Sequence, residues 1–393
     1  MDDAQGAQSA EPETDPATVL VPLLREHAAT TERRRRLAPE VVEALAAEGL
    51  FGLAVPARHG GRQAGLPAQV RTLAELARGC AATSWTMSIY LTGSWLTGLF
   101  PERTAAEVFA DPTARVGVSL SPTGVLSDGP GGLRLTGRWG YNTGVPDAHW
   151  DILGAFRPTV DGGREHVLVL VPTAALTVHD DWYASGLQGT GSNTVECAEL
   201  TVPAERVLPF PTGTALPGGD PRAAPELPRY EVFPLFSTLN VGTPLGIARA
   251  AAEFLVARAP GRPITFSPYP DQSLAPLTHR QVGEVDLTLR LAGLLADDLA
   301  ARTERLGVAH LSHSLAERAT ARASAAYVAK LCREAVDLVS SACGASSVRA
   351  DVPVQRMRRD IQALCLHAAL NPDTALELQG QVALGLVPQS NFL

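Results

Sequence analysis

The sequence predicts an α+β protein that is mainly helical, with a helical region, a central β region and a second helical region in that order. Apolar residues recur at helical spacing over residues 17–112. Residues 113–211 instead hold short runs of β-forming residues separated by Gly, Pro and Asp, and helical spacing returns from residue 231 to 393. A chain of 393 residues is also too long for one compact core. We therefore expect these three regions to be separate domains.

The first region should contain five helices. Pro39 and Pro101 each suit the first turn of a helix, and residues 80–100 form an uncharged run that approaches the length of a membrane span. Because that run is rich in Ser, Thr and Gly, we expect a buried core helix and no membrane segment. The glycine-rich stretch 55–65 lacks phosphate-binding spacing, so it is predicted to be a turn. Residues 1–16 are acidic and rich in small residues, which is typical of a disordered tail.

The β region is predicted from five short runs. They lie at residues 116–120, 133–139, 152–156, 166–171 and 194–202. Residues 212–230 are dense in Pro and Gly and should form a linker.

The last region, residues 231–393, should be a helical bundle. Helices are predicted near residues 235–258, 279–306, 312–342, 353–370 and 373–385. These segments have so few polar interruptions that several must be buried on more than one face. A four-helix bundle that packs against copies of itself would account for this pattern.

Composition restricts the kind of partner and chemistry. The net charge of -8 argues against nucleic acid as the main partner. The five cysteines have no metal-type spacing, so we expect no metal site and a reduced, cytoplasmic chain. Lys330 is the only lysine, which argues against Schiff-base chemistry and a phosphate-gripping P-loop.

One predicted helix carries a candidate catalytic histidine. On a helix that runs to residue 370, Asp360 and His367 project from the same face about two turns apart, with Leu364 between them. An imidazole at the edge of an apolar surface can act as a base near neutral pH. The alternative is a core histidine whose ring is satisfied by a backbone carbonyl.

Two further motifs, together with this helix, carry a family resemblance. Residues 135–144 read Leu-Thr-Gly-Arg-Trp-Gly-Tyr-Asn-Thr-Gly, and residues 182–195 contain Gly-Leu-Gln-Gly-Thr-Gly-Ser-Asn-Thr-Val. With the helical, β, helical order, they make the chain resemble the acyl-CoA dehydrogenase superfamily, and more closely its flavin-dependent (group D, two-component) monooxygenase branch. The dehydrogenases carry a catalytic glutamate eight residues after the aspartate that corresponds to Asp360. Here that position is Ala368, preceded by His367.

The resemblance implies an acyl-CoA dehydrogenase-like fold. It comprises an N-terminal helical domain, a central β-barrel or sandwich and a C-terminal four-helix bundle. It also implies a homotetramer built as a dimer of dimers, in which subunits share a site.

The implied function is the oxygenase component of a two-component flavin-dependent monooxygenase. Such an enzyme uses reduced FMN or FAD and O2, through a C4a-hydroperoxide, to hydroxylate a small organic molecule such as an aromatic or polycyclic natural-product intermediate. Because the chain has no Rossmann fingerprint, a separate NAD(P)H:flavin reductase should supply the reduced flavin. The open alternatives are an N-oxygenase of an amine or amino sugar, an acyl-CoA dehydrogenase, and a relative without redox chemistry.

The resemblance also implies residue roles. Thr143 should meet flavin N5, and His367 should deprotonate the substrate. The remaining flavin contacts expected within the subunit are Ser121, Thr123, Tyr141 and Ser192, and those expected from a neighbouring subunit are Arg262, Phe266 and Gln281. The expected substrate pocket comprises Tyr90, Gly93, Trp95 and Leu364. Gly93 stands where phenol-hydroxylating members often carry a histidine, which makes a phenol substrate less secure.

Overall fold

The computed structural model describes residues 15–129, 131–211, 227–388 and 390. Most of the expected tail, 1–16, and of the expected linker, 212–230, lies outside the described residues. Five helices come first, as expected, and their bounds are α1 Pro16–Arg34, α2 Pro39–Ala47, α3 Leu66–Gly79, α4 Ala81–Thr97 and α5 Glu102–Phe109. Each of α1, α2 and α3 has a proline in its first turn, where the missing N–H costs no hydrogen bond.

The central region is one seven-stranded sheet, in the order β5-β6-β2-β1-β3-β4-β7. The strands are β1 Val116–Gly129, β2 Gly132–Asn142, β3 Trp150–Pro158, β4 Arg164–Pro172, β5 Thr177–Val178, β6 Asn193–Val202 and β7 Val207–Pro209. All pairs are antiparallel except β1 with β3, whose register shifts between Ser119 and Gly124. All five predicted runs form strands, while the short β5 and β7 were not predicted.

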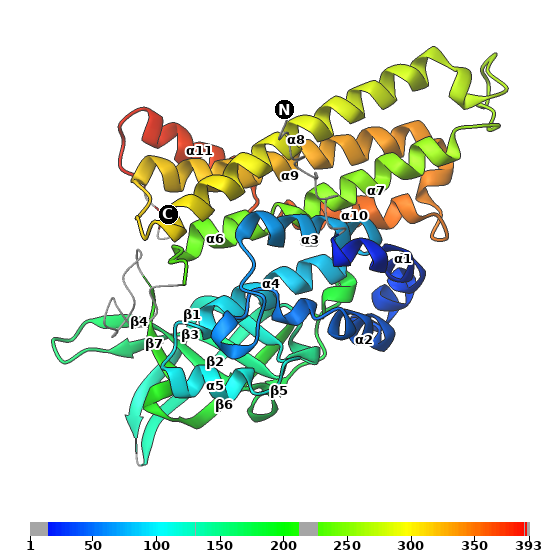
Figure 1. Cartoon of the computed structure of the whole chain (residues 1–393). Helices are drawn as coiled ribbons and strands as arrows, with labels where there is room; N and C mark the ends of the chain where they lie inside the picture. The colour runs from blue at the N-terminus through cyan, green and yellow to red at the C-terminus, as the bar shows by residue number, and fades with distance from the viewer. Residues whose placement is uncertain (1–14, 130, 212–226, 389, 391–393) are drawn as a thin grey trace, which may run out of the picture.

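The last region is a helical bundle in which α8 and α9 are the longest helices. Their bounds are α6 Val232–Leu239, α7 Gly242–Arg258, α8 Pro276–Val308, α9 Leu315–Cys343, α10 Pro353–Leu364 and α11 Pro372–Ala383. The bundle lies on one side of the molecule and the sheet on the other, with α3 and α4 between them (Figure 1). Helix α4 is buried along nearly all its length, as expected. No helix in the described ranges is long and apolar enough to cross a membrane. The predicted fold class is confirmed.

Two predicted helix boundaries were wrong. The segment 235–258 is two helices, α6 and α7, with a break beside Gly242. There the backbone approaches α3 so closely that a Cβ would lie 2.8 Å from the Val70 carbonyl oxygen. The helix expected over 353–370 ends at Leu364. Asn371 takes the extended backbone that a residue before proline prefers, and its side chain caps α11.

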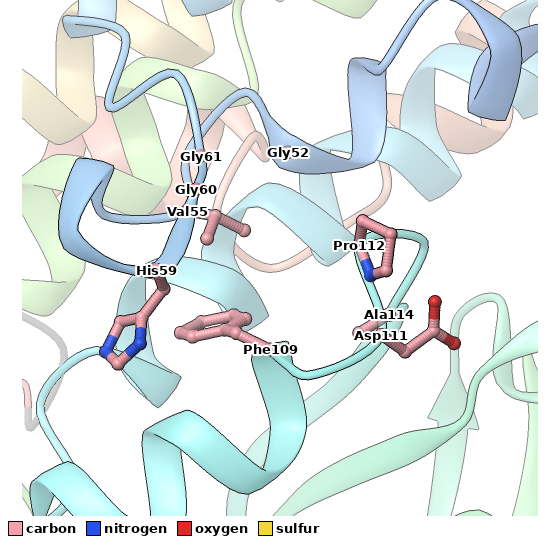
Figure 2. A pocket seen from close by; sticks show the side chains of 9 residues that line it. All are labelled: Gly52, Val55, His59, Gly60, Gly61, Phe109, Asp111, Pro112 and Ala114. Carbon is pink, nitrogen blue, oxygen red and sulfur yellow. The ribbon is translucent and has the colours of Figure 1, made fainter.

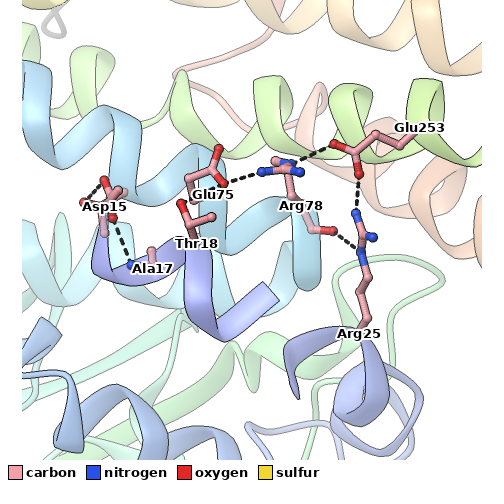
Figure 3. Close-up of polar contacts among 8 residues, drawn as sticks. Asp15, Ala17, Thr18, Arg25, Glu75, Arg78 and Glu253 are labelled. Atoms are coloured by element: carbon pink, nitrogen blue, oxygen red, sulfur yellow. Dashed lines mark hydrogen bonds and ion pairs between the residues drawn. The ribbon is translucent and has the colours of Figure 1, made fainter. Parts of the chain in front are cut away.

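Charged side chains tie the first helices to the bundle. Glu253 on α7 accepts from Arg25 on α1 at 2.5 Å and from Arg78 on α3 at 2.8 Å (Figure 3). Arg25 also donates to the Arg78 backbone carbonyl. Because these groups are partly exposed, we assign them orientation of the helices and little net stability.

A buried polar pair fixes the end of β2. The Asn142 side-chain amide donates to Asp151 Oδ2 at 2.5 Å, and both residues are fully buried. Burial raises the pKa of Asp151 to about 8, against the opposing effect of the Asn142 hydrogen bond. The carboxyl is therefore mainly protonated at pH 7, and it holds the backbone directly before Thr143.

Asp151 should make stability depend on pH. An unfolded aspartate has a pKa of about 3.9, so between about pH 4 and pH 8 the folded state binds the extra proton. The free energy of unfolding should therefore fall as pH rises through this window. Asp151→Asn should remove this contribution. Urea unfolding at several pH values would measure the free energy of unfolding of both proteins. If it had the same pH dependence in the wild type and in Asp151→Asn, the raised pKa of Asp151 would be contradicted.

Candidate functional site

The segment 182–192 is built around the backbone of Leu187. Leu187 has a left-handed conformation, with φ of 51°, and opens the short 3-10 helix η5, Gln188–Thr190. Its carbonyl accepts from Trp182 Nε1 at 3.1 Å and from Thr190 Oγ1 at 2.9 Å. Its N–H donates to Asp360 Oδ1 at 2.7 Å. A left-handed leucine costs about 1–2 kcal/mol, so these bonds select a conformation that leucine alone disfavours.

Three hydroxyl groups join the two glycine-containing motifs. Ser192 Oγ lies 2.8 Å from Thr143 Oγ1 and 2.7 Å from Thr190 Oγ1. All three residues are buried, and the Gly144 N–H donates to the Thr190 carbonyl at 2.8 Å. The structure thus brings together Thr143 and Ser192, which lie 49 residues apart in the chain.

Helix α10 packs directly on this segment. Gly186 is so close to α10 that a Cβ there would lie 2.2 Å from the Arg359 carbonyl oxygen, so only glycine fits. Arg359 donates to the Ser185 carbonyl at 2.7 Å. Burial raises the pKa of Asp360 to about 6, although the Leu187 N–H and Arg356 act in the opposite direction. The Asp360 carboxylate thus joins α10 to the segment 182–192 through the Leu187 N–H.

His367 lies in the turn after α10 and therefore does not continue the Asp360 face of the helix. Its ring packs edge-on against Trp85 of α4, with centroids 5.1 Å apart, and lies 5.9 Å from Phe236 of α6. Burial among these groups lowers the pKa of His367 to about 4. The ring is thus neutral at pH 7.

The hydrogen bonding of His367 defines its tautomer. Nδ1 accepts from the Ala369 N–H at 3.2 Å, so the neutral ring carries its proton on Nε2. In this state Nε2 is a donor. For His367 to act as a base through Nε2, its proton must move to Nδ1, which breaks the hydrogen bond from Ala369. The alternative was a core histidine whose ring is satisfied by a backbone carbonyl. The backbone partner of this ring is instead the Ala369 N–H.

Other expected flavin residues lie at the surface. Ser121 and Thr123 are exposed at the register shift of β1, and the Thr123 hydroxyl donates to the Arg138 carbonyl at 2.8 Å. Tyr141 is 82% exposed, with φ of 58°, and its ring lies 6.0 Å from that of Trp182. The Tyr141–Trp182 contact is a second link between the two motifs.

The four expected pocket residues are not gathered around one described cavity. Tyr90 is buried and donates to the Gly144 carbonyl at 2.6 Å. Gly93 packs against β1, where a Cβ would lie 2.2 Å from the Val116 carbonyl oxygen. Leu364 is fully buried in the bundle core. Only Trp95 lines a described hollow, which also includes Tyr230 and does not include His367.

Among the described residues, the three residues expected from a neighbouring subunit make no contact with the hydroxyl cluster. Arg262 donates to the Cys343 carbonyl and to Ser346 Oγ, both at 2.8 Å. Phe266 is fully exposed with φ of 58°, and Gln281 is half-buried on α8.

Several residues of the site were not predicted. Thr190 stands inside a motif that the sequence displays, so its hydroxyl was open to prediction. Trp85, Phe236 and Thr86 carry no local signal, because they come from helices that are apolar on several faces. Thr86 lies against Gly144, and its buried hydroxyl has no hydrogen-bond partner among the described residues.

A separate small hollow lies beside the glycine-rich turn. His59 and Phe109 lie next to each other on one side of it and Asp111 on the other (Figure 2). It is formed by the predicted turn 55–65 and the end of α5, and it shares no residue with the hydroxyl cluster. Within the described ranges, no group of three or more His, Cys, Asp and Glu side chains could hold a metal ion.

Known proteins match this chain over nearly its whole length. Residues 20–97 match the N-terminal domain and residues 240–372 the C-terminal domain of acyl-CoA dehydrogenases. A pigment production hydroxylase from Rhodococcus sp. (strain ATCC 21145) is 31% identical, over 95% of this chain and 96% of its own. The oxygenase component of an FADH(2)-dependent resorcinol hydroxylase from Rhizobium sp. (strain MTP-10005) is 29% identical, over 94% and 93% of the two chains.

Among solved structures, XiaF from Streptomyces sp., in complex with FADH2 and glycerol, superimposes with a TM-score of 0.88. The two are 28% identical, and the match covers 96% of each chain. The fold and these matches show a flavin enzyme of the acyl-CoA dehydrogenase superfamily. Within it, this chain belongs to the branch of two-component flavin-dependent monooxygenases, which confirms the family expected from the sequence.

The Asp360 carboxylate can be tested with two matched variants. Asp360→Asn keeps an oxygen that can accept from the Leu187 N–H, whereas Asp360→Leu leaves that buried N–H unpaired. We expect the leucine variant to lose about 1–3 kcal/mol of unfolding free energy and the asparagine variant clearly less. Chemical denaturation of both proteins measures the difference. Equal losses would show that the Leu187 bond is not the stabilising contact.

The ring of His367 should stay neutral well below the ordinary histidine range. NMR titration of isotope-labelled histidines, with His367→Gln to assign the signal, should find this ring uncharged at pH 6 and protonating only as pH approaches about 4. An ordinary histidine titrates near pH 6.5. A midpoint at that value would contradict the apolar surroundings described for the ring.

Proposed function

We propose that this protein is the oxygenase component of a two-component system that hydroxylates a small aromatic molecule with reduced flavin and O2. The observation that carries the proposal is the meeting of Thr143, Ser192 and Thr190 on the segment that Asp360 ties to α10. The names of the relatives support it, because one of them is the oxygenase component of a resorcinol hydroxylase.

The hydroxyl cluster fits a reduced flavin. Its ring would be met by the Thr143 and Ser192 hydroxyls, with Ser121, Thr123 and Tyr141 as further proposed contacts. When bound, the flavin supplies the electrons and the site at which O2 is activated. We favour FAD over FMN, because FADH2 is named both for the resorcinol hydroxylase and in the XiaF complex.

The chain itself would position the substrate and exclude water. His367 would bind a substrate hydroxyl from Nε2, and in its other tautomer would remove the proton, which makes an aromatic ring more nucleophilic. Trp85 and Phe236 would limit the access of water to the half-buried imidazole, since both rings pack against it. Ala368 provides no carboxylate at the position of the dehydrogenase base.

The proposed homotetramer has support from α8. Leu287, Leu291 and Leu294 recur at helical spacing and are each about 60% exposed. Burial of such a stripe by another copy would stabilise an oligomer. Arg262, Phe266 and Gln281 stay proposed as contacts with a neighbouring subunit's flavin. The five free thiols are compatible with the proposed cytoplasmic location.

Oxygen labelling tests the function. The protein, a separate flavin reductase, NADH and FAD would be incubated with a panel of phenols under 18O2. We expect one labelled oxygen atom in the product, and no product when the reductase is omitted. Rapid NADH oxidation by the purified protein alone would contradict the two-component arrangement. Absence of labelled product from all phenols, despite flavin binding, would count against aromatic hydroxylation.

His367 should be needed for product formation and dispensable for flavin binding. His367→Ala should bind reduced flavin as the wild type does, yet lose at least about 100-fold in product formation, the usual contribution of acid–base catalysis. His149→Ala is a matched control, because His149 is exposed on the β region and pairs with Arg115 and Asp111. Unchanged turnover in His367→Ala would remove this residue from the mechanism.

A further inference from the structure

The three hydroxyls of the site form a chain whose direction is fixed at one end. A hydroxyl has one proton to donate, whereas a backbone carbonyl can only accept. Thr190 Oγ1 lies 2.9 Å from the Leu187 carbonyl oxygen, so its proton must point to that carbonyl. In its contact with Ser192, 2.7 Å away, Thr190 can then act only as an acceptor.

The hydrogen-bond directions of the Ser192 and Thr143 hydroxyls follow for the same reason. Ser192 must donate its one proton to Thr190, so it accepts in its 2.8 Å contact with Thr143. Thr143 must therefore donate to Ser192. Its remaining lone pairs have no partner among the described residues, and with its proton already used it can only accept from a ligand.

The fixed end of the chain is itself held rigidly. The Leu187 peptide is clamped by the Asp360 carboxylate on its N–H and by Trp182 Nε1 on its carbonyl. Thr190, Ser192 and Thr143 are all at most 7% exposed, so bulk water does not compete for their protons. If the hydroxyls donated in the opposite direction, Thr190 Oγ1 and the Leu187 carbonyl oxygen would lie 2.9 Å apart with no proton between them.

This polarity distinguishes the two redox states of a flavin. N5 of a reduced flavin carries an N–H and is a donor, whereas N5 of an oxidised flavin has a lone pair and is an acceptor. We propose that Thr190 is a positioning residue that, through Ser192, makes the Thr143 hydroxyl an acceptor, so that the site prefers reduced over oxidised flavin. The inference rests on the proposed placement of flavin N5 at Thr143.

Anaerobic binding of oxidised and reduced FAD tests the inference. The ratio of the two dissociation constants would be measured for the wild type, Thr190→Val and Thr190→Ser. Valine keeps the shape of threonine but has no hydroxyl, so Ser192 becomes free to donate to Thr143, and Thr143 can donate to an oxidised flavin. We expect the preference for reduced FAD to fall by about five-fold or more, the equivalent of one hydrogen bond. Serine restores the hydroxyl and should keep the ratio within about two-fold of the wild type.

A second variant makes the test independent of how well Thr190→Val folds. Ser192→Ala cuts the chain between Thr190 and Thr143, so it should lower the preference in the same direction. Thermal unfolding of each variant verifies folding. A ratio that stays at the wild-type value in Ser192→Ala, or in folded Thr190→Val, would overturn the inference while leaving the proposed function intact. Failure of the wild type to bind either form would instead count against the proposed function.

Discussion

The site depends on the position of a single peptide, that of Leu187. Asp360 holds its N–H, while Trp182 and Thr190 hold its carbonyl. These bonds stabilise a left-handed leucine and place Ser192 beside Thr143. Because the carboxylate comes from α10, the same contact sets the distance between the hydroxyl cluster and the helix that leads to His367. This bond, together with that of Arg359 to the Ser185 carbonyl, couples the geometry of the β region to that of the bundle.

The segments that meet at this contact differ in their environment. On one side are three hydrogen-bonded hydroxyls with little access to water. On the other, an imidazole lies among Trp85 and Phe236, and burial keeps it neutral. A neutral histidine would add no charge to the proposed binding site of an aromatic ring. Asp360 bonds the Leu187 N–H, and its burial opposes its ionisation.

Much of the fold could be predicted from sequence because residue periodicity is a local property. The helical, β, helical order and the long strands followed from it, and the motifs that hold Thr143 and Ser192 were visible as glycine-containing runs. Pocket residues could not be assigned in the same way. Helix α4 is buried on almost every side, so its pattern does not show which face meets the site. The start of α11 at Asn371 and Pro372 is a local signal that the apolar spacing obscured, and α10 ends before it, at Leu364.

The most direct test of the account is a rapid-mixing experiment without substrate. Protein loaded anaerobically with reduced FAD would be mixed with oxygenated buffer, and the flavin spectrum followed over time. If the hydroxyl cluster and the apolar walls shield the flavin as described, a spectrum distinct from both reduced and oxidised flavin should persist. The same experiment with Thr143→Val should shorten its lifetime. Immediate return of the wild type to oxidised flavin, with no distinct spectrum, would contradict an oxygenase built on these residues.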